Sequence, residues 1–121
     1  MTGCVYLCND AHVAVPTRLL LGHLSFAWEQ AKAEANVRTR GVTFEEAATT
    51  WLDVLAIERL DEEHSRAEDR WLRIGSSVRG ALLVVWSTER EAGDETVIRI
   101  IGARRTNGRE RALYARQRRT R

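Results

Sequence analysis

The chain has 121 residues, of which 44% are hydrophobic and 30% are charged, and its formal net charge is +2. This length suits a single globular domain with a small core and leaves no room for a second domain. No apolar run approaches the ~20 residues of a membrane-spanning helix, and the N-terminus lacks the pattern of a signal peptide. We therefore expect a cytoplasmic protein that does not contact a membrane.

Residues 1–23 show no clear periodicity, and we interpret them as an N-terminal extension to a domain that spans 24–121. The extension is either disordered or the product of a start codon assigned too far upstream. It contains both cysteines, Cys4 and Cys8, whose spacing without a second pair favours neither a zinc site nor a disulfide. We expect no metal and no cofactor.

Local patterns predict five strands and three helices. Gly41 fits a helix stop, and Thr43 with Glu46 forms a capping box, in which each side chain can bond a free backbone amide, at the start of the second helix. Thr106 can cap the last helix, which Gly108 weakens. In chain order we expect a strand at 24–28, helices at 29–39 and 43–51, strands at 54–60, 70–75, 81–88 and 96–103, and a helix at 106–116.

These elements indicate an α+β fold. Consecutive strands joined by short turns favour an antiparallel meander, because parallel strands need long crossovers. We therefore predict a twisted antiparallel sheet, with the two N-terminal helices and the C-terminal helix packed on one face of it.

Charge is distributed unevenly along the chain. Residues 45–70 contain nine acidic and three basic residues, whereas 95–121 contain nine arginines and two acidic residues. Arginine stays charged and its planar fork matches phosphate geometry, so the second region favours an acidic partner such as nucleic acid, with Arg105 and Arg109 as candidate RNA contacts. From residue 109 onward a solvated charged tail explains the same composition equally well.

Polar residues at strand ends and in turns could supply a cleavage of RNA that needs no metal. In that reaction a base takes the proton of the 2′-hydroxyl, cations stabilise the charge that grows on the phosphate, and an acid protonates the leaving oxygen. Arg99 is the hardest to explain as ordinary surface, because it interrupts an apolar strand where an unpaired charge is costly. For each of the other candidates, an ordinary solvated side chain explains the residue equally well. The candidates are His64, Arg79, Glu89, Glu95, Arg99 and Arg104.

Several segments resemble the BrnT toxins, and together they run from residue 24 to 116. Each segment is short, but their order and spacing are specific. They are FAWEQAKAEAN at 26–36, GVTFEEAA at 41–48, DRWLRIG at 69–75, RGALLVV at 79–85, TER at 88–90 and IRIIGARR at 98–105, followed by RER at 109–111 and a tyrosine at 114.

The resemblance implies a RelE-like fold and the toxin of a type II toxin–antitoxin pair. Such a toxin is a metal-independent endoribonuclease that inhibits translation. Its expected partner is a BrnA-like antitoxin with a ribbon-helix-helix region, in a complex of two copies of each chain that contacts operator DNA only through the antitoxin. The residues that match the family's functional positions are Arg79, Arg99, an acid at Glu89 or Glu95, and the helix lysine Lys32, which could equally be plain helix surface.

Three positions depart from the family's usual residues. Glu29 stands where the family has Asp, Arg40 where it has His, and Gly102 where it has Ser. The change at Arg40 removes any proton transfer by a histidine there. We therefore keep, as an alternative, a catalytically degenerate module that binds an antitoxin and contributes to operon autoregulation. A plain RNA-binding domain without a partner is a third interpretation.

Overall fold

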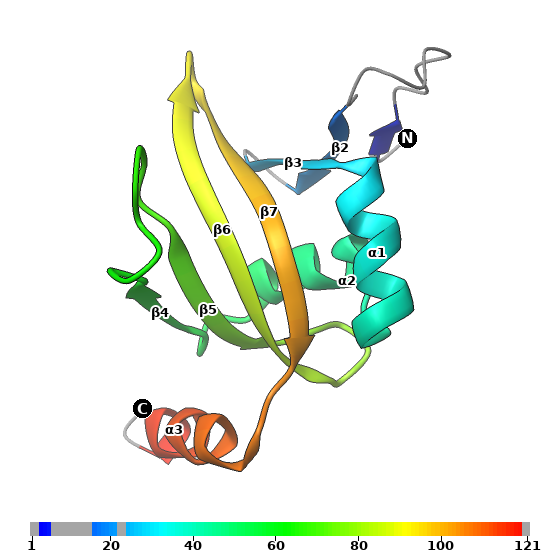
Figure 1. Ribbon diagram of the computed structural model, residues 1–121. Coiled ribbons are helices and arrows are strands. Elements are labelled where there is room, and N and C mark those ends of the chain that lie inside the picture. The colour runs from blue at the N-terminus through cyan, green and yellow to red at the C-terminus, as the bar shows by residue number, and fades with distance from the viewer. Residues whose placement is uncertain (1–2, 6–15, 22–23, 120–121) are drawn as a thin grey trace.

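The computed structural model describes residues 3–5, 16–21 and 24–119, and these residues form one sheet with helices on both of its sides (Figure 1). The sheet they form has seven strands in the order β1-β2-β3-β7-β6-β5-β4. The expected α+β class is confirmed. The strands are β1 (Gly3–Val5), β2 (Pro16–Leu21), β3 (Leu24–Glu29), β4 (Ile57–Leu60), β5 (Trp71–Ser76), β6 (Leu82–Ala92) and β7 (Glu95–Arg105); the helices are α1 (Gln30–Arg40), α2 (Phe44–Ala48), the 3₁₀-helix η1 (Thr49–Leu52) and α3 (Gly108–Arg119).

The sheet is antiparallel except where β3 lies beside β7. These two strands run parallel, with Phe26 opposite Ile98 and Ala27 opposite Arg99. Everything from α1 to β6 lies between them in the chain, which is the long crossover that a parallel pair requires. The predicted wholly antiparallel sheet is therefore wrong at this pairing, whereas β4 to β7 form the expected antiparallel meander.

Two strands precede the first predicted one. β2 pairs antiparallel with β3, and β1 pairs antiparallel with β2. Leu19 and Leu21 of β2 pack against the main core, so apolar contacts attach this strand to the domain. The predicted extension also includes residues 1–2, 6–15 and 22–23, which lie outside the described residues.

The main core lies between the sheet and the helices α1, α2 and η1, which Figure 1 shows beside and behind the strands. Phe26 packs edge-on against Trp51, with ring centroids 5.1 Å apart, and Trp28 packs in the same manner against Phe44 at 5.9 Å. Such aromatic contacts add stabilisation beyond the area they bury. They join α2 and η1 to β3.

Asn36 fixes α1 against β7. Its side-chain amide donates to the backbone oxygens of Val42 and Ala103, at 2.9 Å each, and its side-chain oxygen accepts from the Ala103 N–H. Residues four positions away lie on the same side of a helix. Lys32 and Arg40 are therefore held along the edge of β7 by the same anchor.

The predicted signals at the ends of the first two helices are present in part. Gly41 ends α1 in the left-handed conformation, with φ of 72°. The Thr43 hydroxyl accepts the Glu46 N–H at 3.0 Å, as a cap should. The second bond of the predicted capping box, from the Thr43 N–H to the Glu46 carboxylate, is not formed. The Glu46 carboxylate instead accepts a hydrogen bond from the Ser77 hydroxyl at 2.7 Å.

The last helix starts at Gly108, two residues after the predicted start at 106, and its cap is Asn107. The Asn107 side chain accepts the Glu110 N–H at 2.9 Å, and the Glu110 carboxylate accepts the Asn107 N–H at 2.8 Å. This reciprocal pair is a capping box, so the predicted cap at Thr106 is wrong. Gly108 falls in the first turn of α3, not inside the helix.

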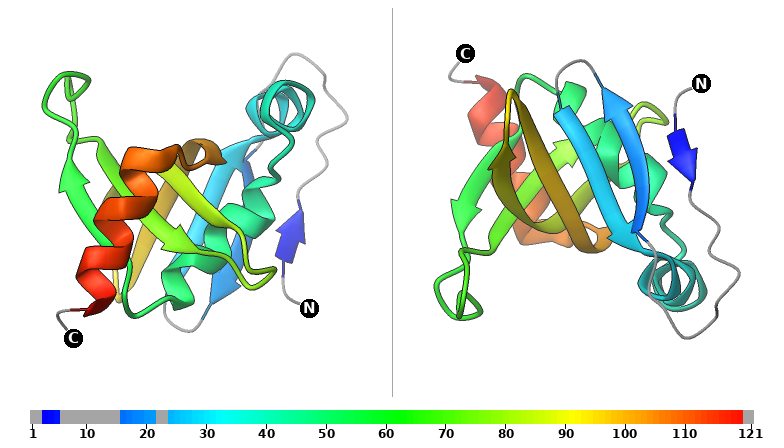
Figure 2. Two further views of the ribbon diagram at one scale, coloured as in Figure 1. Left: turned by 90° about the horizontal axis from the view of Figure 1, so that it is seen from below. Right: turned by 90° about the horizontal axis from the view of Figure 1, so that it is seen from above.

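α3 packs on the side of the sheet opposite α1 and α2. Tyr114 of α3 shares an apolar cluster with Val84, whereas Leu83 and Val85, its neighbours along β6, belong to the main core. Successive side chains of a strand point to opposite faces. The prediction that all helices share one face is therefore wrong, and Figure 2 shows α1 almost along its axis, well apart from α3.

Asp53 ties α3 to the body of the protein. Its carboxylate accepts the Tyr114 hydroxyl at 2.6 Å, the Ser76 N–H at 2.8 Å and the Leu55 N–H at 2.9 Å. Burial alone raises the pKa of the Asp53 carboxyl. These three hydrogen bonds, helped by the positive charge of Arg73, outweigh burial and lower that pKa below its usual value.

Replacing Tyr114 by Phe removes one of these hydrogen bonds, and we expect the free energy of unfolding at neutral pH to fall by about 1–2 kcal/mol. Because the folded-state pKa of Asp53 is lowered, the stability that its ionised form adds is present above the unfolded value of 3.8 and is lost as the pH falls through the folded value. The difference between Tyr114→Phe and the wild type should therefore shrink below pH 3.8. Urea unfolding at neutral and acid pH measures both differences, and equal differences at the two pH values would contradict this role of ionised Asp53.

Candidate active site

A groove lies on the side of the sheet opposite α2, in the half that α3 leaves uncovered. It consists of a cavity of about 510 Å³ and an adjoining one of about 250 Å³, which share Glu68, Thr88 and Arg99. The lining comes from β3, β6, β7, the start of α1 and the loop between β4 and β5. The larger cavity falls in the size range of ligand sites, about 300–1,000 Å³.

Arg99 lines both cavities. Its side chain is 48% exposed, and its guanidinium donates to the Glu29 carboxylate at 2.8 Å. The charged residue in the apolar strand therefore meets both solvent and a carboxylate. An ion pair this exposed contributes only about 0–1 kcal/mol to stability, so folding does not explain the presence of Arg99.

His64 lines the smaller cavity together with Lys32 and Arg99. It belongs to the loop after β4, where Nδ1 of its ring lies 2.9 Å from the Asp61 carboxylate. Because an ionised carboxylate can only accept a hydrogen bond, this contact places a proton on Nδ1 of the neutral ring and leaves Nε2 as the acceptor nitrogen. Asp61 thus fixes the orientation of the His64 ring.

The smaller cavity is strongly basic. Lys32 lines it from α1, and Arg66 and Arg70 line it from the loop between β4 and β5. With Arg99, four cationic side chains line this cavity. The only carboxylate among the described residues that line it is that of Glu68. A hollow lined by one sign of charge attracts a ligand of the other sign, so this part of the groove favours an anion.

Thr88 lies opposite Arg99 on β6 and lines both cavities. The residue is only 6% exposed, yet its hydroxyl makes no hydrogen bond to another described residue. No buried side-chain polar atom among the described residues lacks a hydrogen-bond partner, so the Thr88 hydroxyl is an accessible part of this residue. An unpaired hydroxyl beside Arg99 is suited to bind a polar ligand.

Glu95, one of the two candidate acids, lines the larger cavity. It precedes Arg99 by four residues on β7, an even number, so the two side chains share a face of the sheet. At ~3.3 Å per residue the two positions are about 13 Å apart along the strand. The carboxylate that contacts Arg99 is instead that of Glu29.

Glu89, the other candidate acid, also lines the larger cavity. It pairs with Ile98, whose side chain belongs to the main core, so strand alternation directs Glu89 away from the side that carries Arg99. Burial raises the pKa of the Glu89 carboxyl, two neighbouring carboxylates raise it further, and one arginine partly offsets them. These neighbours are Glu58, Glu91 and Arg73.

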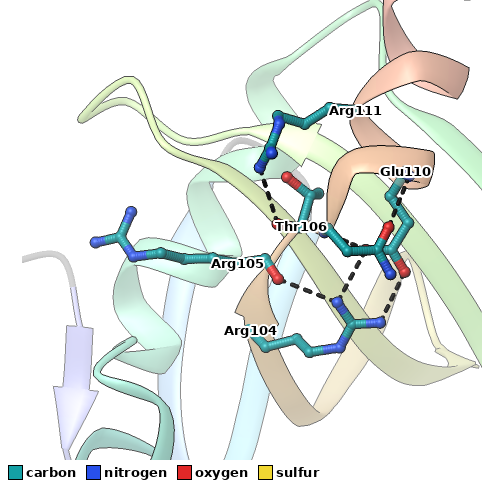
Figure 3. Close-up of polar contacts among 6 residues, drawn as sticks. Arg104, Arg105, Thr106, Glu110 and Arg111 are labelled. Carbon is teal, nitrogen blue, oxygen red and sulfur yellow. Dashed lines mark hydrogen bonds and ion pairs between the residues drawn. The ribbon is translucent and has the colours of Figure 1, made fainter.

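Arg104 lies outside the groove, where β7 ends next to α3 (Figure 3). Its guanidinium donates to both Glu110 carboxylate oxygens, at 2.8 and 2.7 Å, and to the Arg105 backbone oxygen at 3.0 Å, and it lies over the Trp86 ring, 5.3 Å from the centroid. The paired hydrogen bonds raise the pKa of Arg104 and lower that of Glu110, because each partner stabilises the charged form of the other. Arg104 therefore joins β7 to α3.

A β-bulge separates Arg99 from Arg104. The register of β6 and β7 shifts between Trp86 and Ser87, which leaves Ile101 as an extra residue on β7. Five residues apart, the two arginines would alternate to opposite faces of a regular strand, and the bulge returns them to one face. At ~3.3 Å per residue they are nevertheless about 16 Å apart along the strand, and Arg104 is paired with Glu110 outside the groove.

The other predicted cations also lie away from the groove. Arg79 is exposed in the turn between β5 and β6, Arg105 is exposed at the end of β7, and Arg109 is exposed in the first turn of α3. Neither cavity is lined by any of them. The predicted residues that the structure brings to the groove are Lys32, His64, Glu89, Glu95 and Arg99.

Six residues of the site were not predicted as functional, namely Glu29, Asp61, Arg66, Glu68, Arg70 and Thr88. Glu29 and Arg99 are 70 residues apart in the chain, and only the parallel pairing of β3 with β7 brings them together. The signal for Asp61 was present, because a carboxylate three residues before His64 in a polar loop can reach its ring. Glu68 and Thr88 carry no pattern that local sequence analysis can detect.

Two of the departures from the family's usual residues lie beside the groove. A Cβ atom at Gly102 would lie 3.7 Å from Arg40 and 3.9 Å from both Asn36 and Trp86, which are ordinary contact distances. A serine would therefore fit there. The Arg40 guanidinium lies 6.0 Å from the centroid of the Trp86 ring, and neither Arg40 nor Gly102 lines the groove.

Within residues 3–5, 16–21 and 24–119, no group of His, Cys, Asp and Glu side chains is arranged to hold a metal ion. Cys8, His12 and His23 lie outside these ranges. None of the helices in the same ranges is long and apolar enough to cross a membrane.

Comparison with known proteins identifies the family. The model of a family described as the ribonuclease toxin BrnT of type II toxin–antitoxin systems matches residues 28–110. A search of curated proteins gave no match. The matched segment is more than half of the chain and contains the groove residues Glu29, Lys32, His64 and Arg99. The chain therefore belongs to the BrnT family of ribonuclease toxins of type II toxin–antitoxin systems.

Proposed function

We propose that this protein is a metal-independent endoribonuclease that cleaves RNA by attack of a 2′-hydroxyl on the neighbouring phosphate and thereby inhibits translation. The observation that carries the proposal is the groove that gathers Lys32, His64 and Arg99. These side chains are of the kinds needed to bind a phosphate and to move a proton. Membership of the BrnT family supports RNA as the substrate.

Arg99 binds the scissile phosphate in this proposal. Its guanidinium donates to Glu29 and keeps further N–H groups for phosphate oxygens. Lys32, Arg66 and Arg70 surround the same cavity and add positive charge as the negative charge of the phosphate grows. The Thr88 hydroxyl supplies a neutral hydrogen bond beside them.

His64 protonates the leaving 5′-oxygen. The Asp61 carboxylate is in contact with Nδ1, so the N–H at Nε2 supplies the proton in this proposal. The proton of the 2′-hydroxyl passes to one of the carboxylates that line the larger cavity. These carboxylates include the two candidate acids, Glu89 and Glu95.

We also infer the partners that the family pattern implies. The fold is a RelE-like arrangement, and the inhibitor is a BrnA-like ribbon-helix-helix antitoxin in a complex of two copies of each chain. Operator DNA is contacted through the antitoxin, and the protein acts in the cytoplasm. The exposed Arg79, Arg105 and Arg109 contact RNA outside the groove.

Replacing Arg99 by Ala should lower the rate of RNA cleavage by about 10²–10³-fold, because one main stabiliser of the phosphate charge is lost. The fold should remain intact, since the ion pair with Glu29 is exposed. Cleavage of a single-stranded RNA in the presence of a metal chelator, together with a thermal melt, measures both effects. Arg59→Ala, on the exposed face of β4 and outside the groove, is the matched control and should keep the wild-type rate.

A wild-type protein that is folded but cuts no RNA would contradict the proposal and favour the degenerate binding module. Unfolding of Arg99→Ala at ambient temperature would show instead that the Arg99–Glu29 pair is structural. Cleavage that stops when the chelator is added would contradict metal independence.

Replacing Thr88 by Val should weaken RNA binding by about fivefold, the value of one hydrogen bond. The stability should stay equal or rise, because the hydroxyl that is removed has no partner among the described residues. Binding of a 2′-O-methyl RNA, which cannot be cleaved by its own 2′-oxygen, gives the affinity without turnover. Thr39→Val, whose hydroxyl bonds Ala35 on α1 away from the groove, should bind like the wild type; an unchanged affinity for Thr88→Val would contradict a ligand contact at this hydroxyl.

A further inference from the structure

Glu29 is the carboxylate that contacts the phosphate-binding arginine. Its Oε2 atom lies 2.8 Å from Nη2 of Arg99, and its other oxygen makes no hydrogen bond to a described residue. The residue is the last of β3 and lines the larger cavity. A carboxylate in this place is held next to any phosphate that Arg99 binds.

Glu29 directs its carboxylate to Arg99 although its place in the chain favours a different hydrogen bond. It is the N-cap of α1, where a side-chain oxygen normally accepts a hydrogen bond from the first turn of the helix. The Glu29 side chain makes no such bond and turns to Arg99 instead. The carboxylate thus serves the groove and not the helix.

A general base must come within hydrogen-bond reach of the proton that it removes. In RNA the attacking 2′-hydroxyl is on the sugar that carries the scissile phosphate, so its base must lie beside the phosphate site. Glu29 meets this requirement through its contact with Arg99. Glu95 is about 13 Å from Arg99 along β7, and Glu89 points to the other side of the sheet.

We propose that Glu29 is the general base of this protein. The Glu29 carboxylate takes the proton as the 2′-O–H bond breaks, and the 2′-oxygen forms a bond to phosphorus. The bond from phosphorus to the 5′-oxygen breaks, and that oxygen receives the proton of His64. The products are a 2′,3′-cyclic phosphate and a free 5′-hydroxyl, with the charge of the phosphate held by Arg99 throughout. This assignment rests on the ribonuclease function proposed above.

The test compares Glu29→Gln, Glu29→Asp and Glu45→Gln in single-turnover cleavage and in binding of a 2′-O-methyl RNA of the same sequence. Glu29→Gln should cleave about 10²–10⁴-fold more slowly than the wild type, while its RNA affinity stays equal or rises because Arg99 loses a competing carboxylate. Glu29→Asp keeps the carboxylate and should cleave faster than Glu29→Gln. Glu45→Gln, on the exposed side of α2 and outside the groove, is the matched control and should cleave near the wild-type rate.

The pH profile separates a base from a purely structural partner of Arg99. The wild-type rate should fall toward acid pH as the base is protonated, and this fall should be absent from the residual activity of Glu29→Gln. The assignment would be overturned if Glu29→Gln cleaved RNA at the wild-type rate. It would also be overturned if Glu29→Gln lost cleavage and RNA affinity to the same extent and Glu29→Asp restored neither. If the wild-type protein cleaved no RNA, the ribonuclease function itself would be overturned. If the wild type and Glu29→Gln both cleaved RNA at the same rate, only the role of Glu29 would be overturned.

Discussion

The parallel pairing of β3 with β7 is the constraint on which the groove depends. It sets Ala27 opposite Arg99, and two residues later the chain leaves the sheet at Glu29 and enters α1. One pairing therefore places a carboxylate against the Arg99 guanidinium and sets the start of α1 at the edge of the groove. Asn36 then bonds the backbone of β7 and fixes the helix that carries Lys32. Were β3 to slip by one residue, its side chains would exchange faces and the contact between Glu29 and Arg99 would be lost.

The face of the sheet opposite α2 has two halves with different roles. One half stabilises the fold, and the other is open to a ligand. α3 covers one half through two polar contacts, Tyr114 with Asp53 and Glu110 with Arg104, and one apolar cluster. The other half holds the groove. Arg99 and Arg104 illustrate the division, because they are the same residue type on the same strand. Arg104 is closed off by a bidentate carboxylate and an aromatic ring, whereas Arg99 has one exposed partner and remains open to a ligand.

Local signals predicted the elements, and long-range contacts decided the site. Gly41 and Thr43 act within a few residues, so their roles as helix stop and cap could be read from the chain. The capping box of α3 carried a signal of the same kind, but Thr106 stands directly before Asn107 and is also a good cap residue. No local pattern could show that β3 joins β7 in parallel, because the partners are about 70 residues apart. The contact between Glu29 and Arg99, the bulge at Ile101 and the distance from Arg99 to Arg104 all depend on that sheet and were therefore beyond prediction.

The departures from the family's usual residues have different consequences once their places are known. Arg40 stands where the family has a histidine, which was the reason to keep a degenerate module as an alternative, but its guanidinium lies by Trp86 and does not line the groove. Proton transfer does not need a histidine at that position, since His64 reaches the groove from the loop after β4 with Asp61 on its Nδ1 atom. Glu29 keeps the carboxylate that the family's aspartate would supply, with one more methylene to reach Arg99. The groups that the proposed cleavage requires thus lie in one groove, which favours an active ribonuclease over a module that only binds its antitoxin.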